Sequence, residues 1–225
     1  MNMYTLLLLA GCVAVSMAAQ CCVPPQWTSQ GSFLTAIVRD GKPYYSRGSL
    51  GIAFDAVRKR IGQLENIEIN GKTSLNIGVL LDFMANTKWV VNAQTGDCYK
   101  MALNRDTEDF MGCVSENATL VGNQDVVGFG NNDMSLNTYM MDYGNVRVYT
   151  SLTSDSCVPV VDTIRGELDG NNFIQNMHYF NVSAGLPTED PLVVPPHGCE
   201  RAVNFMPSFN YQMSGGLIGK RSVFN

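Results

Sequence analysis

Cysteines are the residues of this sequence whose type and number point most directly to chemistry. One of the seven, Cys12, lies inside an apolar run near the N-terminus, and its removal with that run would leave six. An even number of cysteines in a secreted chain is typical of disulfide bonds. The six are Cys21, Cys22, Cys98, Cys113, Cys157 and Cys199. Their spacing alone does not choose among the many connectivities that six cysteines allow.

Two of these cysteines, Cys21 and Cys22, are adjacent in the chain. Neighbouring Cα atoms lie about 3.8 Å apart, whereas a disulfide usually joins Cα atoms about 5.5 Å apart. We therefore expect each to bond a different, distant cysteine. The two histidines, His178 and His197, stand in unrelated contexts, so no zinc site of cysteine and histidine is predicted.

The N-terminal residues 5–19 are uncharged and mostly apolar and end in small residues, which is typical of a secretory signal peptide cleaved after residue 18 or 19. We expect a signal peptide over 1–18, a β domain over 19–206 and a flexible tail over 207–225. The apolar run is shorter than the roughly 20 residues of a spanning helix, so no membrane span is predicted. Leu9-Ala-Gly-Cys12 has the form of a bacterial lipoprotein box, but the apolar run continues past it, which argues against a lipid anchor.

Two glycosylation sequons fit the same extracellular compartment. They are Asn117-Ala-Thr119 and Asn181-Val-Ser183, and neither has proline in its middle position. The sequence therefore predicts a secreted glycoprotein.

Several functions are disfavoured by composition and by missing motifs. The net charge is −5 and there is no long basic run, so nucleic acid is not an expected partner. No nucleophile elbow, zinc-protease helix or phosphate loop occurs, so no catalytic residue is predicted and a hydrolase is the least favoured alternative. The acidic stretches at 106–109 and 189–190 do not match the EF-hand pattern, which leaves the ligands of any metal ion unknown.

The elements that must position these residues are predicted to be strands. Short apolar runs alternate with Gly, Asn and Asp at spacings near ten residues, which is typical of a sandwich or an open barrel. Turns are expected at Asp40-Gly41, Asn70-Gly71, Thr95-Gly96 and Tyr143-Gly144, and a short helix at 105–111. The expected strands are 32–38, 50–54, 57–63, 77–84, 88–93, 98–103, 138–142, 145–150, 158–168 and 172–182.

Alternating apolar residues on these strands have two interpretations. One is ordinary core packing. The other is the lining of a cavity on a curved sheet, which the charged fraction of 16% and the twelve methionines favour. The predicted pocket residues are Phe54, Leu81, Phe83, Trp89, Val91, Met101, Leu103 and Val148.

Four cysteine environments, taken in order, resemble one family. They are Cys21-Cys-Val-Pro-Pro-Gln-Trp27, the segment Cys98-Tyr-Lys-Met101, the segment Cys157-Val-Pro-Val160 and Pro195-Pro-His-Gly-Cys199. Together they are similar to the ependymin-related proteins. The resemblance implies a mainly β fold of two stacked antiparallel sheets, which form a curved, half-barrel-like sandwich around an apolar pocket as in bacterial lipoprotein carriers. It also implies a secreted or lysosomal homodimer that is associated with calcium and binds a lipid or another hydrophobic small molecule.

The resemblance also implies a disulfide pairing. It joins Cys21 to Cys157, with Cys22 as a close rival for that bond, and Cys98 to Cys199. The remaining bond would join Cys22 to Cys113. Some members of the family have a further bridge from a cysteine before the central hairpin to one near the C-terminus, and this chain has neither cysteine.

Two functional hypotheses follow. The first is a non-enzymatic carrier that holds a lipid or similar ligand in the apolar pocket. The second is an extracellular matrix, adhesion or signalling protein that acts through glycans, calcium and self-association. Uptake of an apolar ligand distinguishes the first from the second.

Overall fold

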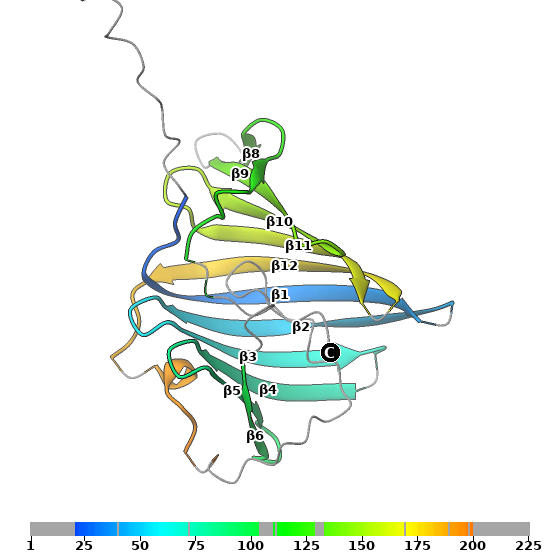
Figure 1. Ribbon diagram of the computed structural model, residues 1–225, viewed down its shortest axis with the longest axis vertical. Helices are drawn as coiled ribbons and strands as arrows, with labels where there is room; N and C mark the ends of the chain where they lie inside the picture. The colour runs from blue at the N-terminus through cyan, green and yellow to red at the C-terminus, as the bar shows by residue number, and fades with distance from the viewer. Residues whose placement is uncertain are drawn as a thin grey trace, which may run out of the picture.

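The fold consists almost entirely of β-strands in a single sheet (Figure 1). The computed structural model describes residues 21–39, 41–71, 73–103, 110, 112–128, 133–168, 170–188, 190–197 and 199. The strands are β1 Gln26–Arg39, β2 Lys42–Asp55, β3 Arg60–Ile69, β4 Thr73–Asp82, β5 Thr87–Asn92, β6 Cys98–Ala102, β7 Thr119–Leu120, β8 Asp125–Val127, β9 Met134–Asp142, β10 Val146–Thr153, β11 Pro159–Leu168 and β12 Asn171–Ala184. A 3-10 helix, η1, spans Pro191–Val193.

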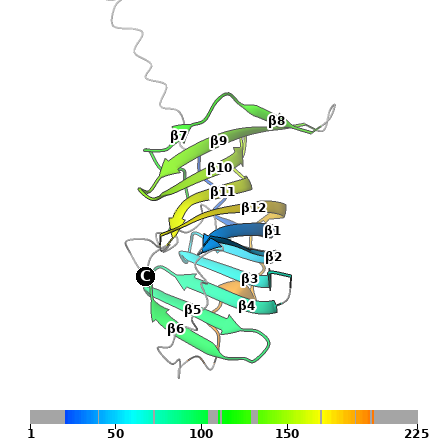
Figure 2. The ribbon, with the colours of Figure 1, turned by 90° about the vertical axis from the view of Figure 1, so that its right-hand side faces the viewer.

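The order of the strands is β6-β5-β4-β3-β2-β1-β12-β11-β10-β9-β7, with β8 paired to β9. Every pairing is antiparallel. The β1–β12 pair joins segments that are far apart in the chain and so unites two series of hairpins. Figure 2 shows the consequence: β6 and β7 lie at opposite ends of the molecule.

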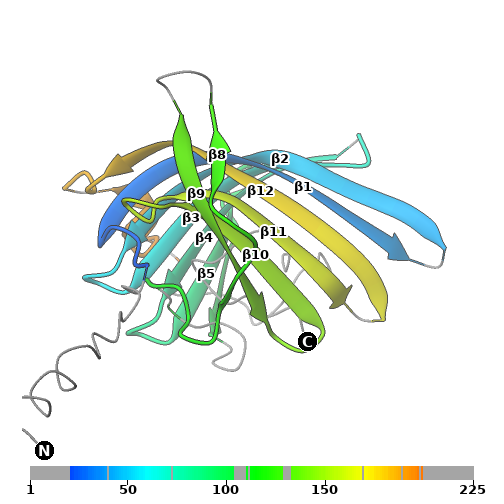
Figure 3. The same cartoon turned by 90° about the horizontal axis from the view of Figure 1, so that it is seen from above.

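The sheet is strongly curved. Seen from above, β1, β2 and β12 lie along the crown of the curve, and β5 and β10 from the two flanks lie on the same side of it (Figure 3). The predicted mainly antiparallel, curved β fold is therefore confirmed. It differs from the expected pair of stacked sheets in being continuous, because β1 and β12 are 14 residues long and bond each other along most of that length.

The expected strands all lie in or overlap observed ones. The sequence pattern missed β7 and β8, and it missed parts of longer strands, among them the first half of β2 and residues 64–69 of β3. The predicted turn at Asn70-Gly71 joins β3 to β4, and both residues have positive φ, at 47° and 70°. The predicted helix at 105–111 falls mostly outside the described residues, as do the signal peptide and the tail, so these stay predictions.

The two faces of the sheet differ sharply in burial. In β1, Trp27, Phe33 and Ile37 are buried, whereas Leu34 and Val38 on the other face are each 50% exposed. All twelve strands belong to one sheet, so the burial of one face comes from its curvature and from the segments that cross it. We call the face that carries Trp27 the inner face and the opposite one the outer face.

Candidate functional site

The inner face is organised in rows of side chains that run across the strands. Because directly paired residues point to the same side of a sheet, the register places Trp27, Phe54, Ile61 and Leu81 in one row at one end of the face. Successive rows are two residues, or about 6.7 Å, apart along the strands. Two apolar clusters result, one around Trp27 and Phe54 and a second around Ile37 and Phe173 at the other end.

An aromatic stack closes the first end of the inner face. The ring of Phe54 lies 5.6 Å from that of Trp27 and 5.1 Å from that of Phe110, measured between centroids. Phe110 also contacts Phe83 edge-on, at 5.3 Å. Phe110 belongs to the connection between β6 and β7, so this connection passes over the inner face.

Disulfides hold that connection in place. The backbone N–H of Val23 donates to Gly112 and that of Val114 donates to Cys21, both at 2.8 Å, beside the Cys22–Cys113 bond. Cys21 bonds Cys157 in the turn between β10 and β11. Residues 110 and 112–118 of the connection are thus tied to the N-terminal segment at the aromatic end of the inner face.

The third disulfide joins Cys98 to Cys199 on the outer face, where Leu80, Trp89 and Cys199 form a separate apolar cluster. The three bonds join the same cysteines that the family resemblance pairs. Cys22 is not the partner of Cys157.

Part of the inner face remains accessible. On β3, β4 and β6 the register turns a set of apolar side chains inward, and these are only half-buried, whereas the row of Trp27, Phe54, Ile61 and Leu81 on the same face is buried. We call this set the inner strip, and it consists of Ile67, Ile69, Leu75, Val79, Tyr99 and Met101. An apolar surface that faces inward and still meets solvent is suited to bind a hydrophobic ligand.

The predicted pocket residues fall into four groups, three of them on the inner face. Phe54, Phe83, Leu81 and Leu103 belong to the buried cluster at the aromatic end, and Met101 lies in the inner strip. Val148 faces inward but belongs to the second cluster.

The other two predicted pocket residues, Trp89 and Val91, point to the outer face. The pairing of Leu81 with Lys88 turns Lys88, Val90 and Asn92 of β5 inward, which places Trp89 and Val91 with Cys199 instead. Of the inner strip, the sequence-based list contained only Met101. The alternation of Ile67 with Ile69 was the available signal for β3.

Polar groups also lie on the inner face. The carboxylate of Asp162 is fully buried and accepts hydrogen bonds from the hydroxyls of Thr150, at 2.6 Å, and Tyr179, at 2.5 Å. Thr35 and Gln175 are buried on the adjacent strands β1 and β12, where they pair directly. The inner face is thus apolar with a few polar positions rather than uniformly apolar.

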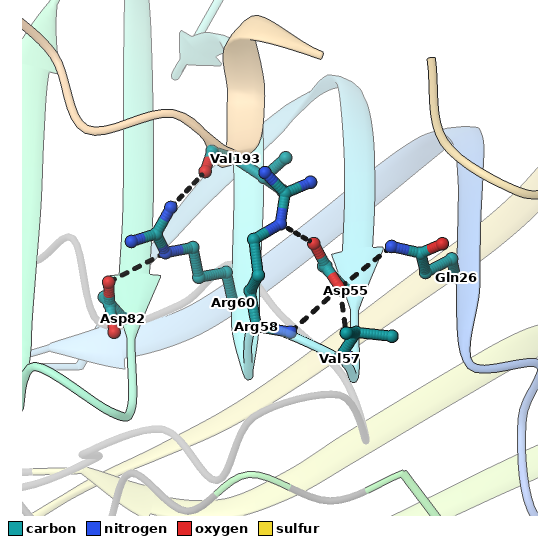
Figure 4. A network of polar contacts seen from close by, with 7 residues as sticks. All are labelled: Gln26, Asp55, Val57, Arg58, Arg60, Asp82 and Val193. Atoms are coloured by element: carbon teal, nitrogen blue, oxygen red, sulfur yellow. Dashed lines mark hydrogen bonds and ion pairs between the residues drawn. The ribbon is translucent and has the colours of Figure 1, made fainter. Parts of the chain in front are cut away.

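A polar network on the outer face fixes the chain after β12 (Figure 4). Arg60 donates to Asp82 at 2.8 Å and to the carbonyl of Val193 in η1 at 3.1 Å. The fit of η1 depends on Gly62, because a Cβ there would lie 1.9 Å from the carbonyl oxygen of Leu192.

Asp55 is the second centre of this network. It is buried and accepts hydrogen bonds from Gln26, from the backbone of Val57, and from the backbone and guanidinium of Arg58. Burial raises the pKa of Asp55, but the hydrogen bonds from Arg58 and Gln26 and the charge of Arg58 outweigh burial and hold that pKa below its ordinary value. The network is therefore a structural clamp, at the opposite face from the inner strip.

The described residues show no cluster of three or more potential metal ligands among His, Cys, Asp and Glu. The acidic stretch 106–109 and Glu189 lie outside them. Both sequon residues, Asn117 and Asn181, are exposed. In the part of the chain that the structure describes, no helix is long and apolar enough to span a membrane.

Comparison with known proteins identifies the family of this chain. A sequence model of the Ependymin family matches residues 71–199, which is more than half of the chain. The chain belongs to the ependymin family. It is also similar to ependymin-related protein 1 of Haliotis asinina, at 26% identity over 207 residues, which cover 85% of this chain and 96% of that protein.

Two solved structures similar to this ependymin-family chain come from bacteria. A LolA superfamily protein of Nitrosomonas europaea matches 74% of this chain and 89% of its own, with 10% identity and a TM-score of 0.33. A putative outer membrane lipoprotein-sorting protein domain of Vibrio parahaemolyticus matches 72% and 88%, with 10% identity and a TM-score of 0.35. Because these TM-scores are low, the description of the fold rests on the strand order and register of this chain.

Proposed function

We propose that this ependymin-family protein is a secreted, non-enzymatic glycoprotein that binds a lipid or another hydrophobic small molecule on its inner strip. The observation that carries the proposal is the half-buried state of Ile67, Leu75, Val79 and Met101 on the same face as the fully buried row of Trp27 and Phe54. A hydrocarbon chain laid against this surface would lose contact with water along its length. At about 0.8 kcal/mol per buried methylene, eight methylenes contribute about 6 kcal/mol before the cost of immobilisation.

Three further features support the proposal. The three disulfides fit an oxidising, extracellular environment. The sequon residues are exposed and so accessible to glycosylation. The six side chains of the inner strip are themselves apolar or aromatic, which suits the binding of a hydrocarbon chain.

Uptake of N-phenyl-1-naphthylamine, an uncharged fluorophore whose emission rises in apolar surroundings, tests the proposal. We expect saturable uptake by the secreted protein and a clear loss with Ile67→Asn, which places an amide in the inner strip. Leu64→Asn is the matched control, because Leu64 is an exposed residue on the outer face of the same strand. Equal uptake by both variants, or none by the native protein, would refute the proposed site.

The second candidate, action through self-association, is favoured by a different surface. Leu120 on β7 and Val126 and Val127 on β8 are more than half exposed at one end of the sheet. A homodimer that covers this end is therefore part of the proposal. Light scattering compares the molar mass of the Val126→Lys variant with that of the native protein. Equal masses would refute this interface.

A further inference from the structure

A short polar row crosses the inner face where three adjacent strands meet. Gln175 of β12 pairs with Thr35 of β1, and Thr35 pairs in turn with Ser46 of β2. The rows on either side of it on β1 and β12 are apolar, with Phe33 beside Met177 and Ile37 beside Phe173. We call Gln175, Thr35 and Ser46 the polar row.

Two members of the polar row have hydrogen-bonding atoms that the described residues do not satisfy. Thr35 and Gln175 are each 2% exposed, and Thr35 Oγ1 and Gln175 Nε2 are buried without a hydrogen-bond partner among the described residues. A buried donor without a partner is costly, and most such groups in native proteins are satisfied. Two of them side by side, between apolar rows of β1 and β12, point to an external acceptor.

The polar row leads directly to the inner strip. Ser46 is half-buried and pairs with Ile69, which is the residue of the inner strip nearest to the polar row on β3. A ligand whose chain lies on the strip can therefore place its polar end at the row. Apolar sites commonly use a few polar groups of this kind to fix the orientation of a ligand.

The charges nearby favour an uncharged polar group. Met177 is one row from Gln175 on β12, and Asp162 of β11 pairs with Met177. The carboxyl of Asp162 therefore lies on the inner face next to the polar row. The basic residues Arg39 and Lys42 of β1 and β2 lie two rows further out, beside the turn that joins these strands. A charged group would have to extend to that turn, whereas an ester or amide carbonyl, or a hydroxyl, matches the amide and hydroxyl donors of the row itself.

We propose that the polar row binds an uncharged hydrogen-bonding group of an amphiphile, whose hydrocarbon chain lies on the inner strip. This inference rests on the proposed function and names the class of ligand: a long-chain ester, amide or alcohol. Gln175 Nε2 donates to the carbonyl or hydroxyl oxygen, and the hydroxyls of Thr35 and Ser46 add a donor or an acceptor.

Displacement of N-phenyl-1-naphthylamine tests the inference, with monolaurin as an uncharged ester and dodecanoate as an anion of equal chain length. We expect the native protein to bind monolaurin more tightly than dodecanoate. The double variant Thr35→Val and Gln175→Met keeps side-chain volume and removes the donors, so we expect about tenfold weaker binding of monolaurin with unchanged uptake of the fluorophore. Thr28→Val is the matched control, since Thr28 is on the outer face of the same strand.

The outcomes separate the two proposals. If the native protein takes up no fluorophore, the proposed function fails and this inference fails with it. If uptake occurs but monolaurin binds the native protein and the double variant equally, or binds more weakly than dodecanoate, only the polar row is refuted. If the double variant is unstable, Ser46→Ala at the half-buried end of the row provides the same comparison with an expected loss of about threefold.

Discussion

Two glycines on the outer face provide the sharpest test of how the chain after β12 is held. Gly62 of β3 lies under η1, and a Cβ there would be 1.9 Å from the carbonyl oxygen of Leu192 and 2.4 Å from its carbon. Gly51 of β2 lies on the same face, and a Cβ there meets no atom within 4 Å. The substitutions Gly62→Ala and Gly51→Ala therefore add the same methyl group to neighbouring strands of the same face.

The two substitutions are expected to have opposite signs. In the middle of a strand alanine is favoured over glycine by about 0.5–1 kcal/mol, so Gly51→Ala should stabilise the protein by that amount. Gly62→Ala must displace η1, which disturbs the hydrogen bond from Arg60 to Val193 and the buried side chain of Val193. A charged hydrogen bond contributes about 1.5–3 kcal/mol and a buried valine about 1.5–3 kcal/mol, so a partial loss of both gives a net destabilisation of about 2–4 kcal/mol.

Thermal unfolding of the disulfide-bonded protein measures both effects. For a chain of this size about 1 kcal/mol corresponds to roughly 2–4 °C, so the melting temperature should fall by about 5–10 °C for Gly62→Ala and rise slightly for Gly51→Ala. Peptide mapping should show the Cys98–Cys199 bond intact in both variants. If Gly62→Ala is as stable as Gly51→Ala, the contact between η1 and β3 is not what fixes this segment.

Three further predictions concern the clamp, the aromatic end and calcium. Because the pKa of Asp55 is lowered in the folded protein, its contribution to stability should be fully present above its ordinary value near 3.8 and lost as pH falls through the lowered value. Urea unfolding between pH 2 and pH 7 should therefore show a flatter acid limb for Asp55→Asn, and an unchanged limb would contradict the clamp. Phe110→Ala removes the ring that stacks on Phe54 and should lower the free energy of unfolding by about 2–4 kcal/mol, whereas a loss within 0.5 kcal/mol would show that the connection from β6 to β7 is held by its disulfide alone. Calcium, which the family resemblance implies, should raise the melting temperature in a way that a chelator reverses, and no shift at millimolar calcium would refute that prediction.

The sequence was informative wherever the evidence was local. Alternation along 77–83 placed Val79 and Leu81 on one face, and the structure turns both inward. It also placed Trp89 and Val91 together, which is right, but it assigned them to the pocket, which the register does not support. A period of two fixes which side chains share a face and says nothing about which face becomes the inner one.

The candidate site was only partly predictable for the same reason. Met101 was found because it stands in a recognisable cysteine-containing strand, whereas Ile67, Ile69 and Leu75 resemble any core residues in sequence. Their distinguishing property is a half-buried state on an inward face, which depends on the curvature of the whole sheet. Thr35 and Gln175 are about 140 residues apart in the chain, so no local pattern links them.

By itself the sequence determined the chemistry of the chain and its family. These conclusions rest on the even set of cysteines, the sequons, the missing catalytic motifs and the four ordered cysteine environments. All of them depend on residue identity and short spacing, which can be read directly from the linear sequence. The tertiary structure decided that β1 and β12 join the strands into one curved sheet, that Trp89 faces outward, and that Thr35 meets Gln175 beside the inner strip. These are consequences of long-range pairing and register, which only the balance of packing over the entire sheet can fix.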